Sequence, residues 1–228
     1  MSDNNAKISA GCYDLNKWLF GGYEKGIITT IYGPAGSGKT NLCILAASSQ
    51  AKKDNKVIFI DTEGGFSVDR LKQIVNEDDK EEYQRALENI LFLRPTNFEE
   101  QKKAFETLLK EINNNKISLI IVDGMTMLYR LEVGEAYHEK DEDKIHGVNK
   151  ELAKQLRTLA EIARKKDMPI IVTNQVYYQF QTEEEFRSGK ERIANMVGGD
   201  ILKYWSKCLI ELQNNNGRRK AILKKHRS

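Results

Sequence analysis

The sequence predicts an α/β fold in which helices flank a twisted, mainly parallel β-sheet that ends in a C-terminal antiparallel hairpin. Short apolar runs alternate along the chain with stretches of helical periodicity. The runs are apolar at consecutive positions, which is typical of strands buried on both faces of a parallel sheet. The first run leads directly into a glycine-rich turn, "GPAGSGKT" at residues 33–40, and a helical pattern follows that turn.

The predicted strands are apolar runs that are too short to form helices. The first, "GIITTIY", is rich in β-branched residues, and "ISLIIVDG" is the most apolar run of the chain, so we expect it to form a central strand. The segment "SKCLIELQNNNGRRKAILKK" predicts two strands joined by a turn at "NNNG". In chain order, strands are expected at 26–32, 56–61, 90–95, 117–124, 168–176 and within 206–225.

The predicted helices connect these strands. The longest has apolar side chains three or four positions apart, which form one face of an amphipathic helix. That face consists of Ile145, Val148, Leu152, Leu156, Leu159 and Ile162. The helices expected are 39–53, 67–76, 80–89, 97–113 and 144–166.

The composition excludes several classes of protein. The 228 residues suffice for one fairly large domain, and 40% apolar with 30% charged residues is ordinary for a soluble chain. No apolar run approaches the roughly 20 residues that span a bilayer, and the N-terminus lacks the apolar segment of a secretory signal. The cysteines and histidines show neither disulfide nor zinc-ligand spacing. We therefore expect a cytoplasmic protein with reduced thiols.

Charge is unevenly distributed, although the formal net charge is only +3. Residues 218–228 carry six Lys or Arg side chains and no acid, whereas residues 132–144 are strongly acidic. Lys and Arg side chains give salt-sensitive affinity for phosphates. The basic tail is therefore the better candidate for contact with a polyanion.

The stretch "GPAGSGKT" matches the phosphate-binding pattern G-x-x-x-x-G-K-T in its strand–turn–helix context, a chance glycine-rich turn being the alternative. Backbone N–H groups of such a loop surround the β-phosphate, and the helix N-terminus adds a positive dipole end. Lys39 would reach the β- and γ-phosphates, and the Thr40 hydroxyl would bind Mg²⁺. With ATP and Mg²⁺ as cofactors, the expected binding residues are Gly33, Pro34, Ala35, Gly36, Ser37, Gly38, Lys39, Thr40 and Asn41.

Polar residues also follow three other predicted strands, at the edge where open α/β sheets bind ligands. Asp123 would hold Mg²⁺ together with Thr40, or else cap the next helix. Glu63 would orient or deprotonate a water that attacks the γ-phosphate, or else be an ordinary loop acid. Gln175 would respond to the γ-phosphate, or else bond to the backbone.

The order of "GPAGSGKT", "FIDTEGGF", "LIIVDG", "VTNQV" and "GGD" resembles the RecA-like recombinases, in particular their archaeal and eukaryotic branch. The resemblance covers nearly the whole chain. It implies a RecA-like P-loop ATPase core that forms one domain over residues 1–228, without the N-terminal helix–hairpin–helix domain of larger members. It implies the same roles for Lys39, Thr40, Glu63, Asp123 and Gln175. It further implies that Arg70 packs its guanidinium against adenine, the alternative being a surface arginine.

The resemblance also implies two DNA-facing loops, near residues 131–145 and 176–197. The first is acidic in this chain and would repel phosphates. The second mixes aromatic and basic residues suited to stacking on single strands, with a solvated loop as the alternative. Together with the basic tail, the expected DNA-binding residues are Tyr177, Tyr178, Arg187, Lys190, Arg192, Arg218, Arg219 and Lys220.

The tail segment "KHR" resembles the K-x-R pair that several RecA-like ATPases extend into the nucleotide site of a neighbouring subunit. Lys225 and Arg227 would then join Glu63 and Gln175 as catalytic residues, and hydrolysis would depend on assembly. A solvated basic strand is the alternative. In the larger recombinases of this resemblance, a linker ahead of the ATPase core carries a Phe-x-x-Ala hook that binds the next subunit. Residues 1–10 contain no phenylalanine, so we expect a homodimer or short oligomer rather than long filaments. Whether Ser228 is the natural end of the chain stays open.

These inferences favour an ATP-binding accessory protein of DNA repair and homologous recombination that binds DNA, regulates the main recombinase and hydrolyses ATP weakly. The resemblance implies single-stranded or branched DNA, the main recombinase RadA and, as a further candidate, a junction nuclease as partners, in a nucleoid-associated location. Two alternatives stay open: an autonomous DNA-dependent ATPase and strand-exchange recombinase, and a RecA-like signalling ATPase that acts on protein partners. Hydrolysis stimulated by single-stranded DNA would favour the first, and failure to retain DNA at low salt would favour the second.

Overall fold

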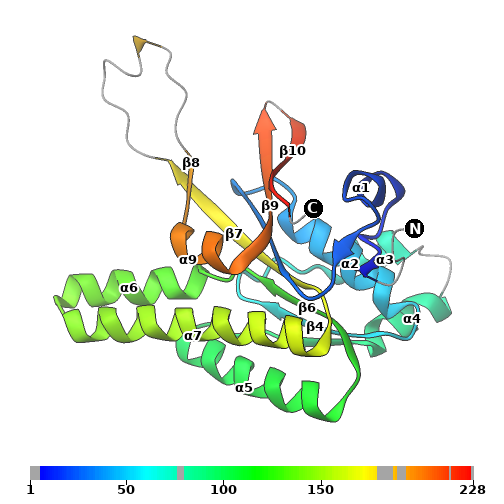
Figure 1. Ribbon diagram of the computed structural model, residues 1–228, viewed down its shortest axis with the longest axis horizontal. Helices are drawn as coiled ribbons and strands as arrows, with labels where there is room; N and C mark the ends of the chain where they lie inside the picture. Colours follow the sequence, from blue (N-terminus) through cyan, green and yellow to red (C-terminus); the bar gives the residue numbers. More distant parts are fainter. Residues whose placement is uncertain (1–5, 76–79, 179–186, 189–193, 216, 227–228) are drawn as a thin grey trace.

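An eight-stranded sheet forms the centre of the structure, a computed structural model that describes residues 6–75, 80–178, 187–188, 194–215 and 217–226 (Figure 1). The strand order is β10-β9-β3-β7-β6-β4-β5, and β8 pairs with β7 beside this path. Neighbours from β9 to β5 are parallel, whereas β9–β10 and β7–β8 are antiparallel. The predicted fold class, a mainly parallel sheet with a C-terminal antiparallel hairpin, is confirmed. The strands are β3 (Ile28–Gly33), β4 (Lys56–Asp61), β5 (Ile90–Leu93), β6 (Ile117–Asp123), β7 (Ile170–Tyr178), β8 (Ala194–Met196), β9 (Ser206–Asn215) and β10 (Arg218–Lys225).

Consecutive side chains of the buried strands point into two separate cores. On β4, Val57 and Phe59 belong to one core and Ile58 and Ile60 to the other, and all four are fully buried. This alternation follows from the two-residue period of a strand. Because both faces are covered, the strand sequences are continuously apolar, which is the pattern that identified them.

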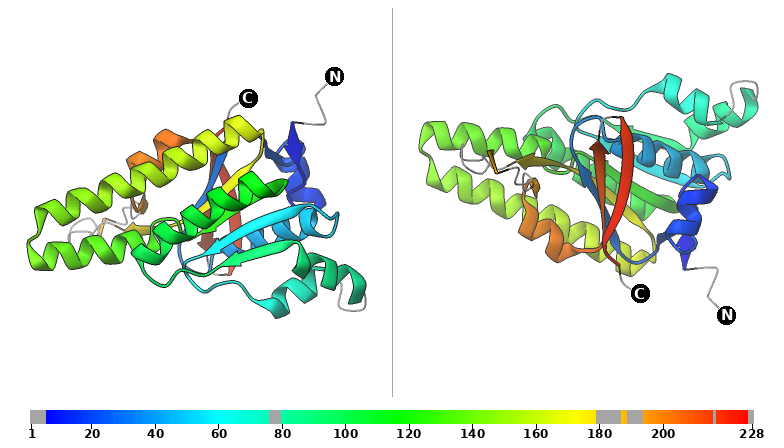
Figure 2. Two further views of the ribbon diagram at one scale, coloured as in Figure 1. Left: turned by 90° about the horizontal axis from the view of Figure 1, so that it is seen from below. Right: turned by 90° about the horizontal axis from the view of Figure 1, so that it is seen from above.

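Two layers of helices cover the sheet (Figure 2). The first core contains buried side chains of α2, α3 and α4, and the second contains side chains of α5, α7 and α9. A separate two-stranded sheet pairs β1 with β2, with α1 between them in the sequence. These elements are α1 (Tyr13–Trp18), α2 (Lys39–Ala51), α3 (Val68–Val75), α4 (Lys80–Glu88), α5 (Phe98–Asn114), α7 (Glu142–Lys166), α9 (Gly199–Trp205), β1 (Lys7–Ile8) and β2 (Tyr23–Glu24).

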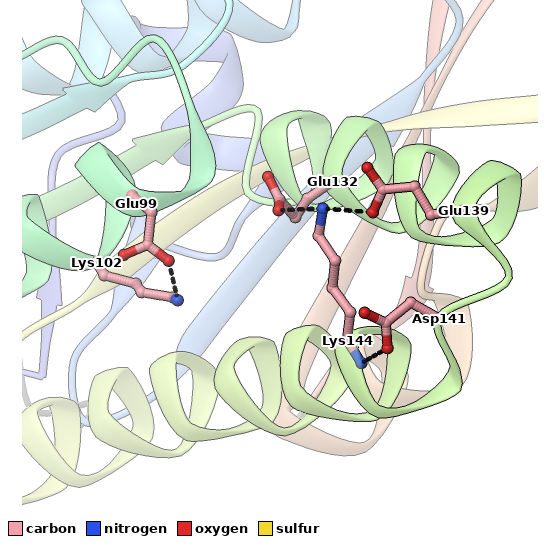
Figure 3. Close-up of polar contacts among 6 residues, drawn as sticks. All are labelled: Glu99, Lys102, Glu132, Glu139, Asp141 and Lys144. Carbon is pink, nitrogen blue, oxygen red and sulfur yellow. Dashed lines mark hydrogen bonds and ion pairs between the residues drawn. The ribbon is translucent and has the colours of Figure 1, made fainter.

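The segment expected to form the first DNA-facing loop, residues 131–145, is instead largely helical. Helix α6 (Met127–Glu139) and α7 form a helical hairpin that extends beyond the sheet (Figure 1). Asp141 caps α7 by accepting the N–H of Lys144 at 2.9 Å. The Lys144 ammonium bridges two acids of α6, Glu132 at 3.5 Å and Glu139 at 3.2 Å (Figure 3). The acidic charge of this segment is thus partly compensated within the hairpin.

The hairpin is also joined to the rest of the molecule. Leu128 of α6 and Val148 of α7 pack with Phe98 of α5 in a small buried cluster. On α5 the neighbouring Glu99 and Lys102 form an ion pair one turn apart (Figure 3). Apolar contact at its base therefore positions the hairpin relative to the sheet.

Across the described residues, no helix combines the length and the apolar character that crossing a membrane would require.

Candidate nucleotide-binding site

The phosphate-binding motif connects β3 to α2, as its sequence context predicts. Strand β3 ends at Gly33 and α2 begins at Lys39. A Cβ on Gly33 would clash with the carbonyl oxygen of Leu212 in β9, so a side chain has no room there. Gly38 caps α2 in the left-handed region, with φ of 102°, which non-glycine residues rarely adopt. These two glycines allow the chain to reverse tightly before the helix.

Lys39 is enclosed by the loop that it follows. Its side chain is only 6% exposed, and its Nζ donates to the carbonyl oxygens of Gly33 and Pro34 at 3.0 Å each. Burial lowers the pKa of Lys39, and the carboxylates of Glu63 and Asp123 oppose that effect. An ammonium held by neutral carbonyls beside a helix N-terminus is well suited to exchange these partners for phosphate oxygens.

Asp123 and Thr40 meet at the position expected for Mg²⁺ binding. The Thr40 hydroxyl donates to Asp123 Oδ2 at 2.7 Å. Thr173 of β7 donates to the other carboxylate oxygen at 2.6 Å and accepts the N–H of Gly124 at 2.8 Å. Burial raises the pKa of the Asp123 carboxyl, while the hydrogen bonds from Thr173 and Thr40 oppose this rise. A hydroxyl and a carboxylate in contact form the hard oxygen ligand set that Mg²⁺ prefers.

Glu63 and Gln175 are also brought together, although β6 lies between β4 and β7 in the sheet. Gln175 Nε2 donates to Glu63 Oε2 at 3.1 Å, and Gln175 lies opposite Gly33 in the β3–β7 register. Glu63 Oε1 is buried and has no hydrogen-bond partner among the described residues. A buried carboxylate oxygen without a donor requires explanation, and a water positioned beside a nucleotide would supply the missing donor.

Two residues that the sequence analysis did not identify organise this site. Asp61 is 2% exposed and accepts N–H groups from Glu63, Gly65 and Phe66 at 3.1–3.2 Å, which shapes the turn that carries Glu63. Thr173 orients Asp123, as described above. The signal for Asp61 was its position at a strand end directly before "TEGG", whereas Thr173 carries no pattern that distinguishes it from any buried strand residue.

A third unpredicted residue is Arg130 of α6. It lines a small cavity together with Glu63, Gln175 and Thr126. A guanidinium on this cavity adds a positive charge close to the proposed water-activating group. In the sequence Arg130 lies two positions before the acidic residues 132–144, and no motif there indicates a role for it.

Some expected site residues lie outside this cluster. Arg70 is exposed on α3, and its Nη1 donates to Gln73 at 2.9 Å, so its contact with adenine stays a prediction. The Lys225 ammonium donates to the carbonyl oxygens of Lys203 at 3.1 Å and Ser206 at 2.7 Å, at the end of α9. Arg227 lies outside the described residues.

The expected DNA-binding residues fall into two groups. Arg218, Arg219 and Lys220 are exposed on β10. Tyr177 is 47% exposed near the end of β7. The backbone of Tyr178 pairs with Ala194 of β8; Arg187 is exposed, and Lys190 and Arg192 lie outside the described residues.

A P-loop on a parallel sheet, with acids at the ends of the adjoining strands and a C-terminal antiparallel hairpin, defines a RecA-like recombinase fold. The model of the Rad51 family matches residues 2–227. The chain belongs to the Rad51 family, and the resemblance inferred from its motifs is confirmed.

The individual relatives agree with this assignment. The chain is 43% identical to the DNA repair and recombination protein RadB of Methanocaldococcus jannaschii, over 93% of this chain and 90% of the relative. It is 38% identical to RadB of Methanobrevibacter smithii, over 99% of this chain and 90% of the relative. A crystal structure described as the RadB recombinase superposes with a TM-score of 0.73 at 32% identity and covers 96% of this chain and 90% of that chain.

Proposed function

We propose that this chain is an ATP-binding protein of DNA repair and homologous recombination that binds DNA, assists or regulates a main recombinase and hydrolyses ATP weakly. The observation that carries the nucleotide part is the convergence of Lys39, Thr40, Asp123 and Glu63 at the carboxyl ends of neighbouring strands. The names of the RadB relatives, DNA repair and recombination proteins, support the cellular role.

Each residue has a defined task in this proposal. Lys39 exchanges its two carbonyl partners for phosphate oxygens, and Thr40 and Asp123 hold Mg²⁺, which would supply positive charge at the phosphates. Glu63 accepts the proton of an attacking water at Oε1, the oxygen that has no partner among the described residues. Gln175 fixes the carboxylate through Oε2.

Slow turnover in an isolated subunit is supported by the position of Lys225. Its ammonium bonds two carbonyl groups of its own chain, so it is not extended toward the nucleotide of a neighbouring subunit in this conformation. Charge supplied in trans to the transition state raises hydrolysis rates by orders of magnitude. Without a charge from a neighbouring subunit, ATP would mainly control the binding of the chain to its partners.

An accessory role is supported by the charge of the two exposed hairpins. The β9–β10 hairpin presents Arg218 and Lys220, which suits phosphate contact without sequence preference. Residues 132–144, at the turn of the α6–α7 hairpin, carry six acidic side chains against two lysines and would repel a DNA backbone. We propose DNA and the main recombinase RadA as partners, with a junction nuclease as a further candidate, and a homodimer or short oligomer as the assembly.

A second candidate function is an autonomous DNA-dependent ATPase and recombinase. The contact between Glu63 and Gln175 supports it, because these two residues would complete the set proposed for hydrolysis. ATP turnover of the purified chain, measured alone, with single-stranded DNA and with RadA, separates the two. Turnover that rises at least tenfold with DNA alone would favour the autonomous enzyme, whereas a change in RadA strand exchange without such stimulation would favour the accessory role.

The nucleotide assignment is tested by Lys39→Ala. Removing a charge-assisted donor to phosphate costs about 1.5–3 kcal/mol, so affinity for a fluorescent ATP analogue should fall at least about tenfold. Lys52→Ala is the matched control, because Lys52 lies at the other end of α2 and pairs with Glu82. Equal affinity of Lys39→Ala and the unmodified chain would exclude this phosphate site.

A further inference from the structure

The C-terminal hairpin lies directly beside the phosphate-binding loop. Strand β9 pairs in parallel with β3, and its Leu212 carbonyl occupies the space that a side chain on Gly33 would need. Strand β10 pairs with β9 so that Arg219 lies opposite Asn214, two residues beyond Leu212. Backbone contacts therefore fix the position of β10 relative to the loop.

Arg219 extends from this strand to the beginning of α2. Its Nη1 lies 3.7 Å from the point that a Cβ on Gly38 would occupy, and Gly38 directly precedes Lys39. The guanidinium is thus within a few ångströms of the turn that would surround the phosphates. Among the described residues, no acidic side chain forms an ion pair with Arg219.

Two positive charges lie near Arg219 at the start of α2, and the carboxylates of Glu63 and Asp123 act on Lys39 from the strand ends. The N-terminus of α2 contributes the positive end of the helix dipole, and the Lys39 ammonium is enclosed by the same loop. Adding a guanidinium there is unfavourable unless an anion with several oxygens binds, and the fork of N–H donors of an arginine matches phosphate oxygens. A nucleoside di- or triphosphate has this chemistry.

Strand geometry separates Arg219 from its basic neighbours. Side chains alternate between the two faces of a strand, so Arg218 and Lys220 point to the face opposite Arg219. Lys224, farther along β10, is paired with Glu211 at 2.9 Å. The basic segment of β10 therefore does not act as one surface.

We infer that Arg219 is a nucleotide-binding residue that contacts the phosphates of ATP or ADP bound in its own subunit, and that only Arg218 and Lys220 of this segment are available to DNA. This inference rests on the proposed nucleotide site. It assigns β10 two different ligands, one on each face.

Equilibrium binding of fluorescent ATP and ADP analogues, without DNA, tests the assignment. Arg219→Ala should weaken both by about 10- to 100-fold, the loss expected for a charge-assisted contact, and Arg219→Lys should retain part of the affinity because it keeps the charge. Arg218→Ala is the matched control, and its nucleotide affinity should stay within about twofold of the unmodified chain. Equal losses in both Ala variants, or no loss in Arg219→Ala, would overturn the inference.

DNA affinity measured without nucleotide provides the second readout. Arg218→Ala should bind single-stranded DNA less tightly, whereas Arg219→Ala should bind it as the unmodified chain does; the reverse result would assign Arg219 to DNA. The melting temperature of the nucleotide-free protein should not change in Arg219→Ala, because the side chain is exposed. If the unmodified chain itself fails to bind ATP, the proposed function fails, which is distinct from a failure specific to Arg219.

Discussion

Asp123 has no exposed surface, although it carries a carboxyl group. Burial raises the pKa of this carboxyl, the hydrogen bonds from Thr173 and Thr40 oppose the rise, and Glu63 and Asp61 add to it. Between the usual pKa of an aspartate and the raised one, the folded chain binds more protons than the unfolded chain. Stability therefore falls as pH increases through that interval, and the loss is complete above the raised pKa. The buried, ionised carboxylate that would hold a cation therefore lowers the stability of the nucleotide-free protein.

Asp123→Asn should raise the melting temperature of the nucleotide-free protein at pH 7, by about 2–4 °C if the change contributes about 1 kcal/mol in a chain of this size. The amide keeps the shape of the side chain and removes the buried charge. The gain should shrink as the pH is lowered toward the usual pKa of aspartate. Thermal unfolding at a series of pH values measures this dependence, and Asp143→Asn, at an exposed position of α7, is the control.

The same variant should lose stabilisation by Mg²⁺ and ATP, because one of the proposed metal ligands is gone. A ligand that binds only the folded state raises the melting temperature in proportion to the logarithm of its concentration over its dissociation constant. Asp123→Asn should therefore have a higher melting temperature without ligand and a smaller rise in melting temperature when Mg²⁺ and ATP are added. A variant that is less stable at pH 7 and responds fully to Mg²⁺ and ATP would contradict both parts.

The residues of this site differ in how far the sequence reveals them. Lys39 and Thr40 belong to a spaced motif, and Asp123, Glu63 and Gln175 follow apolar runs, so their meeting follows from the common edge of parallel strands. Thr173 could not be found in this way. Its role depends on the pairing of β7 beside β6, which a local pattern does not encode.

At the scale of elements, the α6–α7 hairpin shows where sequence patterns are insufficient. Within α6 only Leu128 and Ala136 are buried, so the helix lacks the repeating apolar face that identified α7. Its exposed Leu131 and Tyr137 obscure any amphipathic pattern. Capping by Asp141 and the bridge from Lys144 to Glu132 and Glu139 depend on two helices packing together. The central strands were predictable because burial on both faces imposes a continuous apolar run.

Two glycines within this hairpin allow a direct test of its helical structure. An alanine Cβ at Gly134 or Gly147 would meet no atom within 4 Å, and glycine costs about 0.5–1 kcal/mol relative to alanine inside a helix. Gly147→Ala should therefore raise the melting temperature by about 1–4 °C. If residues 131–145 formed an irregular loop in solution, no such gain would be expected for Gly134→Ala.

Gly33→Ala provides the opposite case. A Cβ there would clash with the carbonyl oxygen of Leu212, so the substitution should lower the melting temperature and also weaken ATP binding. Thermal unfolding of all three glycine variants measures both effects. Gly134→Ala and Gly147→Ala should raise the melting temperature, and Gly33→Ala should lower it.

At the scale of the whole molecule, β7 connects the nucleotide site to the segment that the resemblance assigns to DNA. Gln175 bonds Glu63 through its side chain, and its carbonyl oxygen accepts the N–H of Val197 at 3.3 Å. Asn174, its neighbour, donates to the Val197 carbonyl at 2.6 Å. Val197 directly follows β8. Strands β7 and β8, which come before and after residues 179–193 in the sequence, are therefore hydrogen-bonded next to Gln175, the residue expected to respond to the γ-phosphate. The proposed nucleotide site and the segment that the resemblance assigns to DNA thus share strand β7.

At the same scale, salt dependence tests which face of the molecule would contact DNA. Each phosphate contact with single-stranded DNA releases condensed counterions and contributes about 0.7 to the slope of log affinity against log salt concentration. Arg218→Ala and Lys220→Ala together should therefore weaken binding and reduce the magnitude of the slope by about 1.4 if both side chains touch phosphates. Lys103→Ala, on exposed α5 surface, should leave the slope unchanged. An unaltered slope in the double variant would place the DNA contact away from β10, and the second loop, near residues 176–197, would become the stronger candidate.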